Sequence, residues 1–421
     1  MADDDGTDLA GSLDPRPDGW SGDQPAGDTP DTVTETTSRN WFGRLGDAIV
    51  GVLIGLLLVA GTCIGLFWNE GRAVQTSRSL AEGSGLVVDV PAARVDPANE
   101  GRLIHLAGDL ATGADLVDLD LGVTARAARL ARKVEMFQWK EESQSSSQKK
   151  LGGGEETTTT TTYTRTWSDR RIDSSRFRNP SGHANPQPRF GESDVTARDA
   201  TLGAFRPGGA ALRAIPASQD LTVPAAALDR IRARLGPVSV QDGRLFLGRD
   251  PANPAVGDLR VSYRIVPEGP ASLIGRQTGG DITAFQTKAG DQLLMGETGL
   301  VPADAMFRSA AVENTILTWA IRLACAIFMW MGWFLLLRPI AVAGDLVPLI
   351  GSVLAAGAGL AAFLLTVVTA PLVAAIAWLF YRPVVSLALL AAGGAIVLAL
   401  RRLAARRRIS PPTLRPTARP A

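Results

Sequence analysis

The chain has 421 residues, 46% of them hydrophobic, and its formal net charge at pH 7 is +1. A chain this close to neutral has no general attraction to polyanions, so we expect no nucleic-acid partner. The two cysteines, Cys63 and Cys325, both lie in apolar stretches, which leaves the polar middle of the chain without a disulfide.

The first segment, residues 1–40, is acidic and polar. Residues 1–37 are rich in Asp, Gly, Pro and Thr and contain too few apolar side chains to form a packed core. They also lack the basic start and the apolar stretch of a signal peptide. We therefore predict a disordered acidic tail, which the charge argument below places in the cytoplasm.

A first transmembrane helix is predicted over residues 41–70. Residues 48–68 form an uncharged apolar run whose length matches the roughly 20 residues that cross a bilayer as a helix. Four glycines of this run fall within an arc of about 120° on one helix face, namely Gly51, Gly55, Gly61 and Gly65. Such a face lets another helix approach closely, and that partner is either a helix of the same chain or one of a second copy.

Residues 71–313 are predicted to form one β-rich α+β domain. Segments rich in β-branched and aromatic residues alternate with turn residues, and a helix is expected at 225–235, where apolar residues recur every three to four positions. Residues 131–139 and 157–167 are expected to pair as a hairpin. The low-complexity residues 143–154 would form its flexible tip.

Three more spans are predicted at residues 314–338, 346–381 and 383–402. The last two are separated at Arg382-Pro383, because an unpaired Arg at mid-membrane is costly. An alternative separates them at Pro371 and buries Arg382. The predicted fold class is thus a membrane protein with four transmembrane α-helices and a large extracytoplasmic domain between the first and second helices.

Positive charge near the ends of the spans predicts the orientation. Five arginines close the last span and open a basic tail, residues 403–421, which should stay in the cytoplasm: Arg401, Arg402, Arg406, Arg407 and Arg408. Four spans then place the N-terminus in the cytoplasm as well, and the domain outside it. These arginines either only fix the topology or also contact anionic lipid.

Two ionisable residues lie near the outer end of the predicted helices. Glu70 directly follows the first span, and Arg322 lies about two turns inside the second. Either the two form an interfacial charge pair that locks the helices together, or Arg322 extends to the lipid headgroups without a partner.

The sequence shows no pattern typical of an enzyme. It has two histidines, His105 and His183, and no metal-ligand spacing, nucleophile elbow or phosphate-binding loop. We expect both histidines to be packed structural residues. No catalytic residue, metal site or cofactor is therefore predicted.

Several motifs, in order along the chain, resemble the LUMA family of four-span membrane proteins. They are WNEGRAV at 68–74, RKVEMFQW at 132–139, IDSS at 172–175 with GHANP at 182–186, and WLFYRP at 378–383. The resemblance covers residues 41–402. The acidic N-terminal tail and the Ser-, Thr- and Gly-rich insertion depart from the family pattern.

The resemblance implies cytoplasmic termini, a lumenal domain, self-association and no established catalytic residues. It further implies that eukaryotic members lie in the endoplasmic reticulum and inner nuclear membrane and bind lamina-linked proteins. The abundance of Arg, Ala and Gly favours a GC-rich bacterial genome, so the bacterial inner membrane is the expected location. In a bacterium, only membrane organisation or oligomerisation would carry over.

We therefore expect a non-enzymatic integral membrane scaffold. It would contact the lipid bilayer, form a homo-oligomer and bind an unidentified membrane or envelope protein, or lipid, through its outer domain. The alternatives are a lipid- or envelope-stress-sensing component and, in third place, a membrane-anchored hydrolase.

Overall fold

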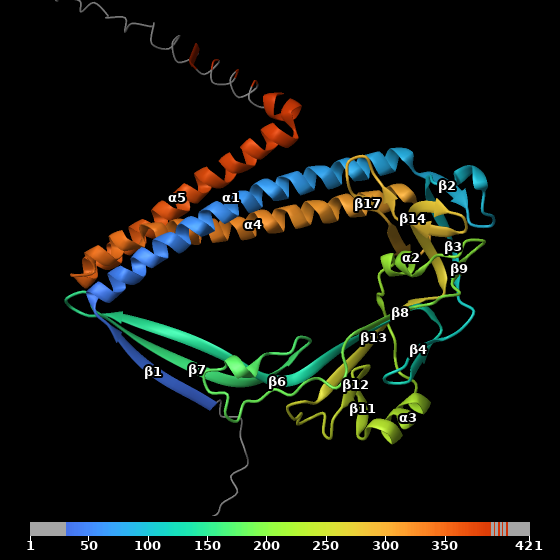
Figure 1. Cartoon of the computed structure of the whole chain (residues 1–421), viewed down its shortest axis with the longest axis horizontal. Coiled ribbons are helices and arrows are strands. Elements are labelled where there is room, and N and C mark those ends of the chain that lie inside the picture. The colour runs from blue at the N-terminus through green and yellow to red at the C-terminus, as the bar shows by residue number, and fades with distance from the viewer. Residues whose placement is uncertain (1–30, 389–390, 392–394, 396–397, 399–400, 403–421) are drawn as a thin grey trace, which may run out of the picture.

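The computed structural model describes residues 31–388 together with 391, 395, 398, 401 and 402. Three long helices lie together on one side of the molecule, and a β-rich part joins them at one end (Figure 1). The helices are α1, Trp41–Leu86, α4, Ala303–Gly344, and α5, Pro348–Tyr381. All three are long and apolar enough to cross a membrane.

Helices α1 and α4 extend beyond the predicted spans. α1 continues to Leu86 instead of ending at residue 70, and α4 begins at Ala303 instead of residue 314 and passes through Pro339 to Gly344. The prediction ended each span with its apolar run, but a helix outside the bilayer needs only one apolar stripe. The predicted domain boundaries, 71 and 313, both fall inside these helices, so each helix continues from its predicted span into the β-rich domain.

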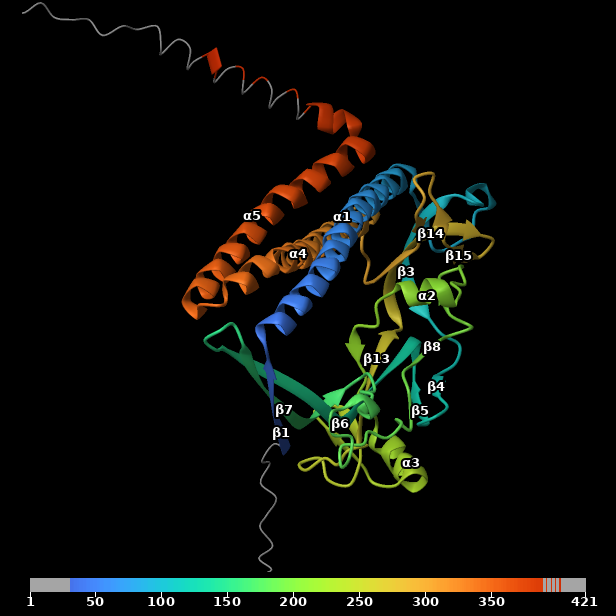
Figure 2. The same cartoon turned by 60° about the vertical axis from the view of Figure 1, so that its left-hand side comes forward.

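The ends of α1 and α4 next to the β-rich part are called their outer ends below, and the opposite ends their inner ends. The outer parts of the two helices form a stalk that carries the β-rich part. The two helices run antiparallel and side by side (Figure 1, Figure 2). At about 1.5 Å per residue, the 46 residues of α1 reach about 69 Å, more than twice the roughly 30 Å of a bilayer's hydrocarbon core. At their outer ends both helices enter a small apolar core, where Leu80 of α1 and Met306 and Phe307 of α4 lie with three strand residues, Leu103, Ile274 and Leu293.

Helix α5 ends at Tyr381, and helical structure resumes at Pro383 after an interruption at Arg382. The helix passes through Pro371, so the alternative break at that residue does not occur. Residues 389–400 are described only in part, and residues 403–421 lie outside the described residues. The fourth span, 383–402, and the basic tail therefore stay predictions.

Two main sheets make up the β-rich part. The larger sheet runs in the order β1-β7-β6-β13-β12-β11, with β8 added to β6 and β10 added to β13, and all of its pairs are antiparallel. Its strands are β1 (Asp31–Arg39), β6 (Ala127–Lys149), β7 (Glu155–Ser168), β8 (Ser193–Thr196), β10 (Gln219–Asp220), β11 (Val238–Gln241), β12 (Arg244–Leu247) and β13 (Leu259–Pro267).

The smaller sheet runs in the order β15-β14-β3-β2, with β18 added to β14 and β9 added to β3. Its strands are β2 (Val88–Pro91), β3 (Leu103–Ala111), β9 (Thr201–Leu202), β14 (Gly269–Thr278), β15 (Asp281–Thr283) and β18 (Met295–Thr298). Two further strand pairs are β4 (Leu116–Asp118) with β5 (Val123–Ala125), and β16 (Phe285–Gln286) with β17 (Gln292–Leu293).

One apolar core joins the two sheets. It contains Leu106 of β3 and Leu273 of β14 from the smaller sheet, and Leu130 of β6 and Val261 of β13 from the larger one. Two short helices contribute to it, α2 (Gly209–Ala214) and α3 (Ala225–Leu235). Two 3-10 turns, Pro97–Asn99 and Ser174–Arg176, contribute no residue to it. The helix predicted at 225–235 is confirmed by α3, whose Ala227 and Ile231 are buried in this core.

A three-stranded arm, built by β1, β7 and the distal half of β6, extends from the larger sheet (Figure 1). Strands β6 and β7 pair from Met136↔Ser168 to Lys149↔Glu155, so the turn comprises only residues 150–154. Hydroxyl groups bond across the strands at 2.8–3.0 Å, in the pairs Ser143–Thr161, Ser145–Thr159 and Ser147–Thr157. The predicted flexible tip, 143–154, was too long because such cross-strand pairs stabilise a sheet without apolar residues.

The prediction of a disordered tail is wrong for residues 31–39. They form β1, which pairs with β7 from Asp31↔Tyr163 to Arg39↔Glu155. The segment TVTETT at 32–37 is rich in β-branched residues, which suit a strand next to an available edge. Composition did not reveal this strand because its partner lies far later in the chain.

The position of the arm conflicts with the predicted topology. Its tip lies at the start of α1, whereas its base lies with the β-rich part near the opposite end of that helix (Figure 1). A bilayer around residues 48–68 would separate the two, and polar strands cannot lie exposed in lipid. If α1 crosses the membrane, the arm and β1 must leave this position.

A shortened arm should leave the β-rich part folded. We expect that replacing residues 144–160 by a two-residue Asn-Gly turn changes the melting temperature of the purified protein little, because no residue between 137 and 162 belongs to the main core. Thermal unfolding followed by circular dichroism measures this. Loss of expression or a melting temperature lower by more than a few degrees would show that the arm is required for folding.

Candidate functional site at the seam of the helices

Helices α1 and α4 pack against each other along a seam, and their backbones are in contact at Gly55 and Gly332. A Cβ atom on Gly55 would lie 2.7 Å from the carbonyl oxygen of Gly332, and one on Gly332 would lie 3.0 Å from the carbonyl oxygen of Gly55. Distances under 3.0 Å are too short for a carbon atom, so the two backbones touch where no side chain fits. Gly332 was not singled out from the sequence, where it is a lone glycine among bulky residues.

Three of the four predicted packing glycines face α4. The Cβ position of Gly51 lies 3.8 Å from Leu335, and that of Gly65 lies 3.4 Å from Sγ of Cys325. Gly61 has no atom within 4 Å of its Cβ position. At 100° per residue, Gly61 lies at the edge of the glycine arc, about 120° from Gly55, and so faces away from the seam. The partner helix that the sequence left open is thus α4 of the same chain, except at Gly61.

Glu70 and Arg322 meet at the outer end of the seam. Nε of Arg322 donates to Oε1 of Glu70 at 2.6 Å, and Nη2 donates to Oε2 at 2.8 Å, so the pair is bidentate. The indole nitrogen of Trp378 on α5 also donates to Oε2, at 2.7 Å. Glu70 is only 1% exposed. A single carboxylate therefore holds all three helices together.

Next to this pair lies a second polar cluster that the sequence analysis missed. Arg72 donates to the side-chain oxygens of Asn314 at 2.9 Å, Thr318 at 3.0 Å and Asn69 at 3.3 Å. Asn314 in turn donates to the carbonyl oxygen of Ala73 at 3.1 Å. The three-residue spacing of Asn69 and Arg72, and the four-residue spacing of Asn314 and Thr318, would have shown that each pair shares a helix face.

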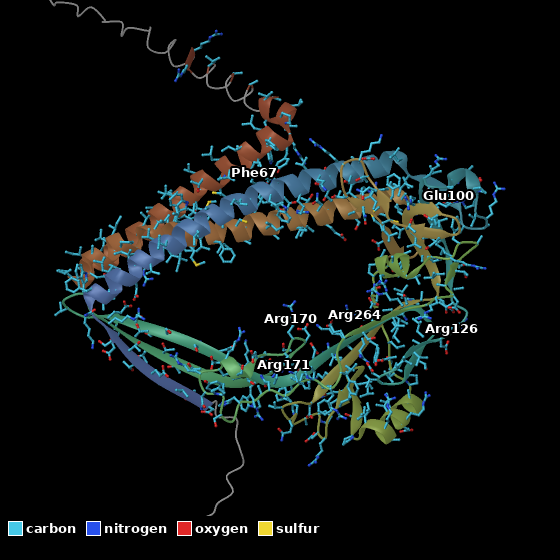
Figure 3. All side chains as sticks on the ribbon, viewed as in Figure 1. Phe67, Glu100, Arg126, Arg170, Arg171 and Arg264 are labelled. Carbon is cyan, nitrogen blue, oxygen red and sulfur yellow. The ribbon has the colours of Figure 1, made fainter. Side chains whose placement is uncertain are left out.

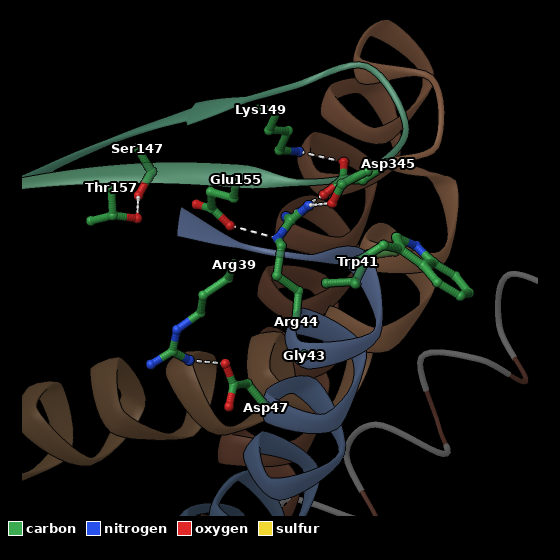
Figure 4. A network of polar contacts seen from close by, with 12 residues as sticks. Arg39, Trp41, Gly43, Arg44, Asp47, Ser147, Lys149, Glu155, Thr157 and Asp345 are labelled. Atoms are coloured by element: carbon green, nitrogen blue, oxygen red, sulfur yellow. Dashed lines mark hydrogen bonds and ion pairs between the residues drawn. The ribbon is translucent and has the colours of Figure 1, made fainter. Parts of the chain in front are cut away.

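At the inner end of the seam lies a second ion pair, in which α1 supplies the arginine and the end of α4 supplies the carboxylate. Nη2 of Arg44, on α1, lies 2.5 Å from Oδ2 of Asp345, which is 1% exposed at the end of α4 (Figure 4). The indole nitrogen of Trp41 donates to the carbonyl oxygen of Val342 at 3.0 Å. The tip of the arm adds two contacts of 2.6 Å, Lys149–Asp345 and Glu155–Arg44.

Aromatic side chains attach α5 to α1 at the outer end. Phe67 lies on α1 (Figure 3). Its ring centroid is 5.8 Å from that of Phe380 and 5.2 Å from that of Tyr381. Gly71 lies beside them and leaves room for the Tyr381 ring, because a Cβ on Gly71 would lie 2.6 Å from it. The WLFYRP segment thus packs against the end of the first apolar run.

Of the five predicted C-terminal arginines, Arg401 and Arg402 are exposed. Arg406, Arg407 and Arg408 lie outside the described residues. Both alternatives for these side chains, topology alone or contact with anionic lipid, therefore stay predictions.

Both histidines are buried and bonded within the β-rich part. His105 lies between Oδ1 of Asp89, at 2.6 Å, and the carbonyl oxygen of Val301, at 3.0 Å. His183 stacks on Tyr163 with 4.0 Å between ring centroids, and its Nδ1 lies 3.0 Å from the carbonyl oxygen of Asn179. These are the contacts of packed residues, and among the described residues no group of His, Cys, Asp or Glu side chains is placed to hold a metal ion.

A buried ionic network crosses the larger sheet. Arg132 of β6 contacts both carboxylate oxygens of Asp118 at 2.7 Å, and the Tyr263 hydroxyl donates to the same carboxylate at 2.5 Å. Burial, together with the neighbouring Asp118, raises the pKa of Tyr263, so the phenol stays a donor at neutral pH. Because every charge in this network has a partner, we interpret it as structural support.

The outer charge pair predicts a non-additive double-mutant cycle. Arg322→Leu leaves the buried Glu70 unpaired, and Glu70→Gln leaves the half-buried Arg322 without its countercharge. Each change should cost up to roughly 3–5 kcal/mol of unfolding free energy, with the larger loss for Arg322→Leu, and the double variant should cost less than the two losses added. Chemical denaturation in detergent measures the three values.

The exposed pair Asp304–Arg308 on the same helix serves as the control. Its cycle should give roughly 0–1 kcal/mol, as exposed ion pairs do. Strict additivity at Glu70 and Arg322 would mean that the two residues are not coupled.

The seam also predicts opposite outcomes for two glycines of α1. Gly55→Ala places a Cβ against the backbone of α4 and should lower the melting temperature in detergent. Gly61→Ala meets no neighbour and should be neutral or slightly stabilising, because Ala favours the helix by about 1 kcal/mol over Gly. Equal effects of the two substitutions would contradict the observed seam.

Comparisons with known proteins agree on one family. The family model described as Transmembrane protein 43 matches residues 136–383, which reach from β6 to the end of α5. Transmembrane protein 43 of Homo sapiens is 32% identical over 377 residues, covering 87% of this chain and 92% of the human protein. The Mus musculus protein of the same name is 32% identical over 364 residues, covering 83% and 89%.

A more distant relative extends the same result to insects. The Transmembrane protein 43 homolog of Drosophila melanogaster is 29% identical over 374 residues, covering 86% of this chain and 95% of the fly protein. No solved structure matches the chain. With three apolar helices and homologues that match over most of its length, the chain is a multi-pass integral membrane protein of the transmembrane protein 43, or LUMA, family.

Proposed function

We propose that this protein is a non-enzymatic membrane scaffold that holds its β-rich domain at a fixed position above the bilayer. The observation that carries the proposal is the continuity of α1 and α4, which run from their apolar spans into the core of the domain. Two ion pairs and a glycine contact fix these helices against each other. A stalk of this kind suits a protein that holds a domain in place better than one that catalyses a reaction.

In this proposal the domain binds a protein or lipid outside the cytoplasm, and the membrane is the bacterial inner membrane. The positive charges near the helix ends support this orientation, and the composition supports a bacterial origin. In a eukaryotic cell, the corresponding location would be the endoplasmic reticulum or the inner nuclear membrane.

Self-association is the second part of the proposal, and Gly61 supports it. This glycine belongs to the first apolar run, yet no atom lies within 4 Å of its Cβ position. That face of α1 is therefore open to a helix of a second copy. Close helix contacts in membranes commonly use such small residues.

Disulfide crosslinking in native membranes tests the self-association. In a Cys63→Ser, Cys325→Ser background, Gly61→Cys should form crosslinked dimers. Gly51→Cys, which faces α4, should not. Crosslinks followed by mass spectrometry would also reveal other partners. Equal crosslinking at both positions, or none in either variant, would argue against a dimer through this face.

Topology is tested by labelling single cysteines with an impermeant thiol reagent in intact cells. We expect Ser168→Cys in β7 to react and Ser38→Cys in β1 to be protected, since α1 should cross the bilayer. The 12 Leu, Ile, Val and Phe residues in 48–68 favour insertion by roughly 4–7 kcal/mol, which exceeds what an exposed edge strand such as β1 gains.

The opposite result is equally informative. If both cysteines react in intact cells, β1 and β7 lie on the same side of the membrane, as their pairing in the structure requires. Helix α1 would then not cross the bilayer, and the scaffold proposal would lose its membrane stalk.

A further inference from the structure

A groove of about 580 Å³ follows the outer halves of α1 and α4 and ends beside α5. Its lining combines apolar side chains, such as Leu80 and Phe307, with the hydroxyl groups of Ser77 and Thr315. All lining residues come from the three long helices, except Arg382, which directly follows α5. The groove thus belongs to the stalk and not to the sheets.

The end of the groove next to the apolar spans is basic. The groove lining contains two carboxylates, and each is paired with an arginine of the lining: Glu70 with Arg322 at this end, and Asp304 with Arg308 near the start of α4. Arg382 supplies a further positive charge: it is half-buried, it interacts electrostatically with Glu70, and among the described residues its side chain makes no hydrogen bond or salt bridge that would occupy its guanidinium. The pair with Glu70 uses Nε and Nη2 of Arg322, which leaves Nη1 for another acceptor.

This basic end lies where the apolar spans end. The apolar run of α1 ends at Trp68, and α5 ends at Tyr381. In α4 the uncharged stretch begins directly after Arg322, about two turns inside the predicted span. The exposed side chains of Trp68 and Trp319, 61% and 63% accessible, fit the aromatic belt at a lipid–water interface. An anion bound beside Arg382 would therefore sit at the level of the lipid headgroups.

We propose that the groove binds the headgroup of an anionic phospholipid from the outer leaflet. Its phosphate would lie between Arg382 and Nη1 of Arg322, and its headgroup hydroxyls would reach toward Ser77 and Thr315. The acyl chains would return to the bilayer beside α4 and α5. The excess positive charge selects an anionic over a zwitterionic headgroup, and the interfacial level selects a lipid over a free anion.

One copy of the chain provides all residues of this lipid site, so the site does not depend on the proposed self-association. It therefore goes beyond the proposed scaffold function. Arg382 serves as a lipid ligand and Arg322 contributes while remaining paired with Glu70. Crosslinking through Gly61 and lipid binding at Arg382 can therefore succeed or fail independently.

Native mass spectrometry of the full-length protein in detergent tests the site. With phosphatidylglycerol and phosphatidylcholine added at equal concentration, the protein should retain phosphatidylglycerol preferentially. Arg382→Gln should weaken phosphatidylglycerol binding about fivefold, the contribution of one arginine near an anionic headgroup, and leave phosphatidylcholine unchanged. Arg382→Lys should retain much of the binding, because it keeps the charge.

Arg276→Gln, at an exposed arginine on β14 that does not line the groove, is the matched control and should bind like the wild type. Equal retention of the two lipids by the wild type would overturn the proposal, and so would unchanged binding by Arg382→Gln. Displacement of phosphatidylglycerol by inorganic phosphate alone would assign the groove to a free anion instead. If Arg382→Gln does not fold, the lipid and phosphate competitions on the wild-type protein decide.

Discussion

The backbone contact between Gly55 and Gly332 brings α1 and α4 closer than any pair of side chains would allow. Helices gain little from hydrophobic burial against each other in lipid, so packing and polar pairs decide their arrangement. Here α1 carries Arg44 near its start and Glu70 just beyond its apolar run, and α4 carries Asp345 and Arg322 at the matching levels. Only antiparallel helices in this register satisfy both pairs around the glycine contact.

The remaining parts of the molecule are positioned relative to that seam. α5 joins it through the Trp378 bond to Glu70 and through the rings around Phe67. The β-rich part joins it through the small core at Leu80 and Phe307. The arm is different, because it contacts the helix ends through charges and is stabilised along its length by hydroxyl pairs and backbone bonds. It is therefore the part that a bilayer can displace at the lowest cost.

The sequence was most informative where a residue contrasted with its surroundings. Glu70 and Arg322 stand out beside apolar runs, and the structure brings them together, but only the folded helices show which faces meet. Arg44, Arg72 and Gly332 were not singled out from the sequence. Gly61 shows the limit of spacing rules, since it belongs to the same arc as Gly55 and yet lies outside the contact. Residues 31–39 show another limit, because pairing with a distant strand overrode a disorder-like composition.

The unbroken length of α1 makes the stalk a lever. About 30 Å of its roughly 69 Å would lie in hydrocarbon, so a tilt of roughly 10° shifts the outer end sideways by about 7 Å. Membrane helices respond to a thinner or thicker bilayer by tilting. A helix without a hinge between span and domain converts such a change in thickness into a displacement of the sheets. A change in bilayer thickness would thereby change the position of the β-rich part relative to the membrane surface.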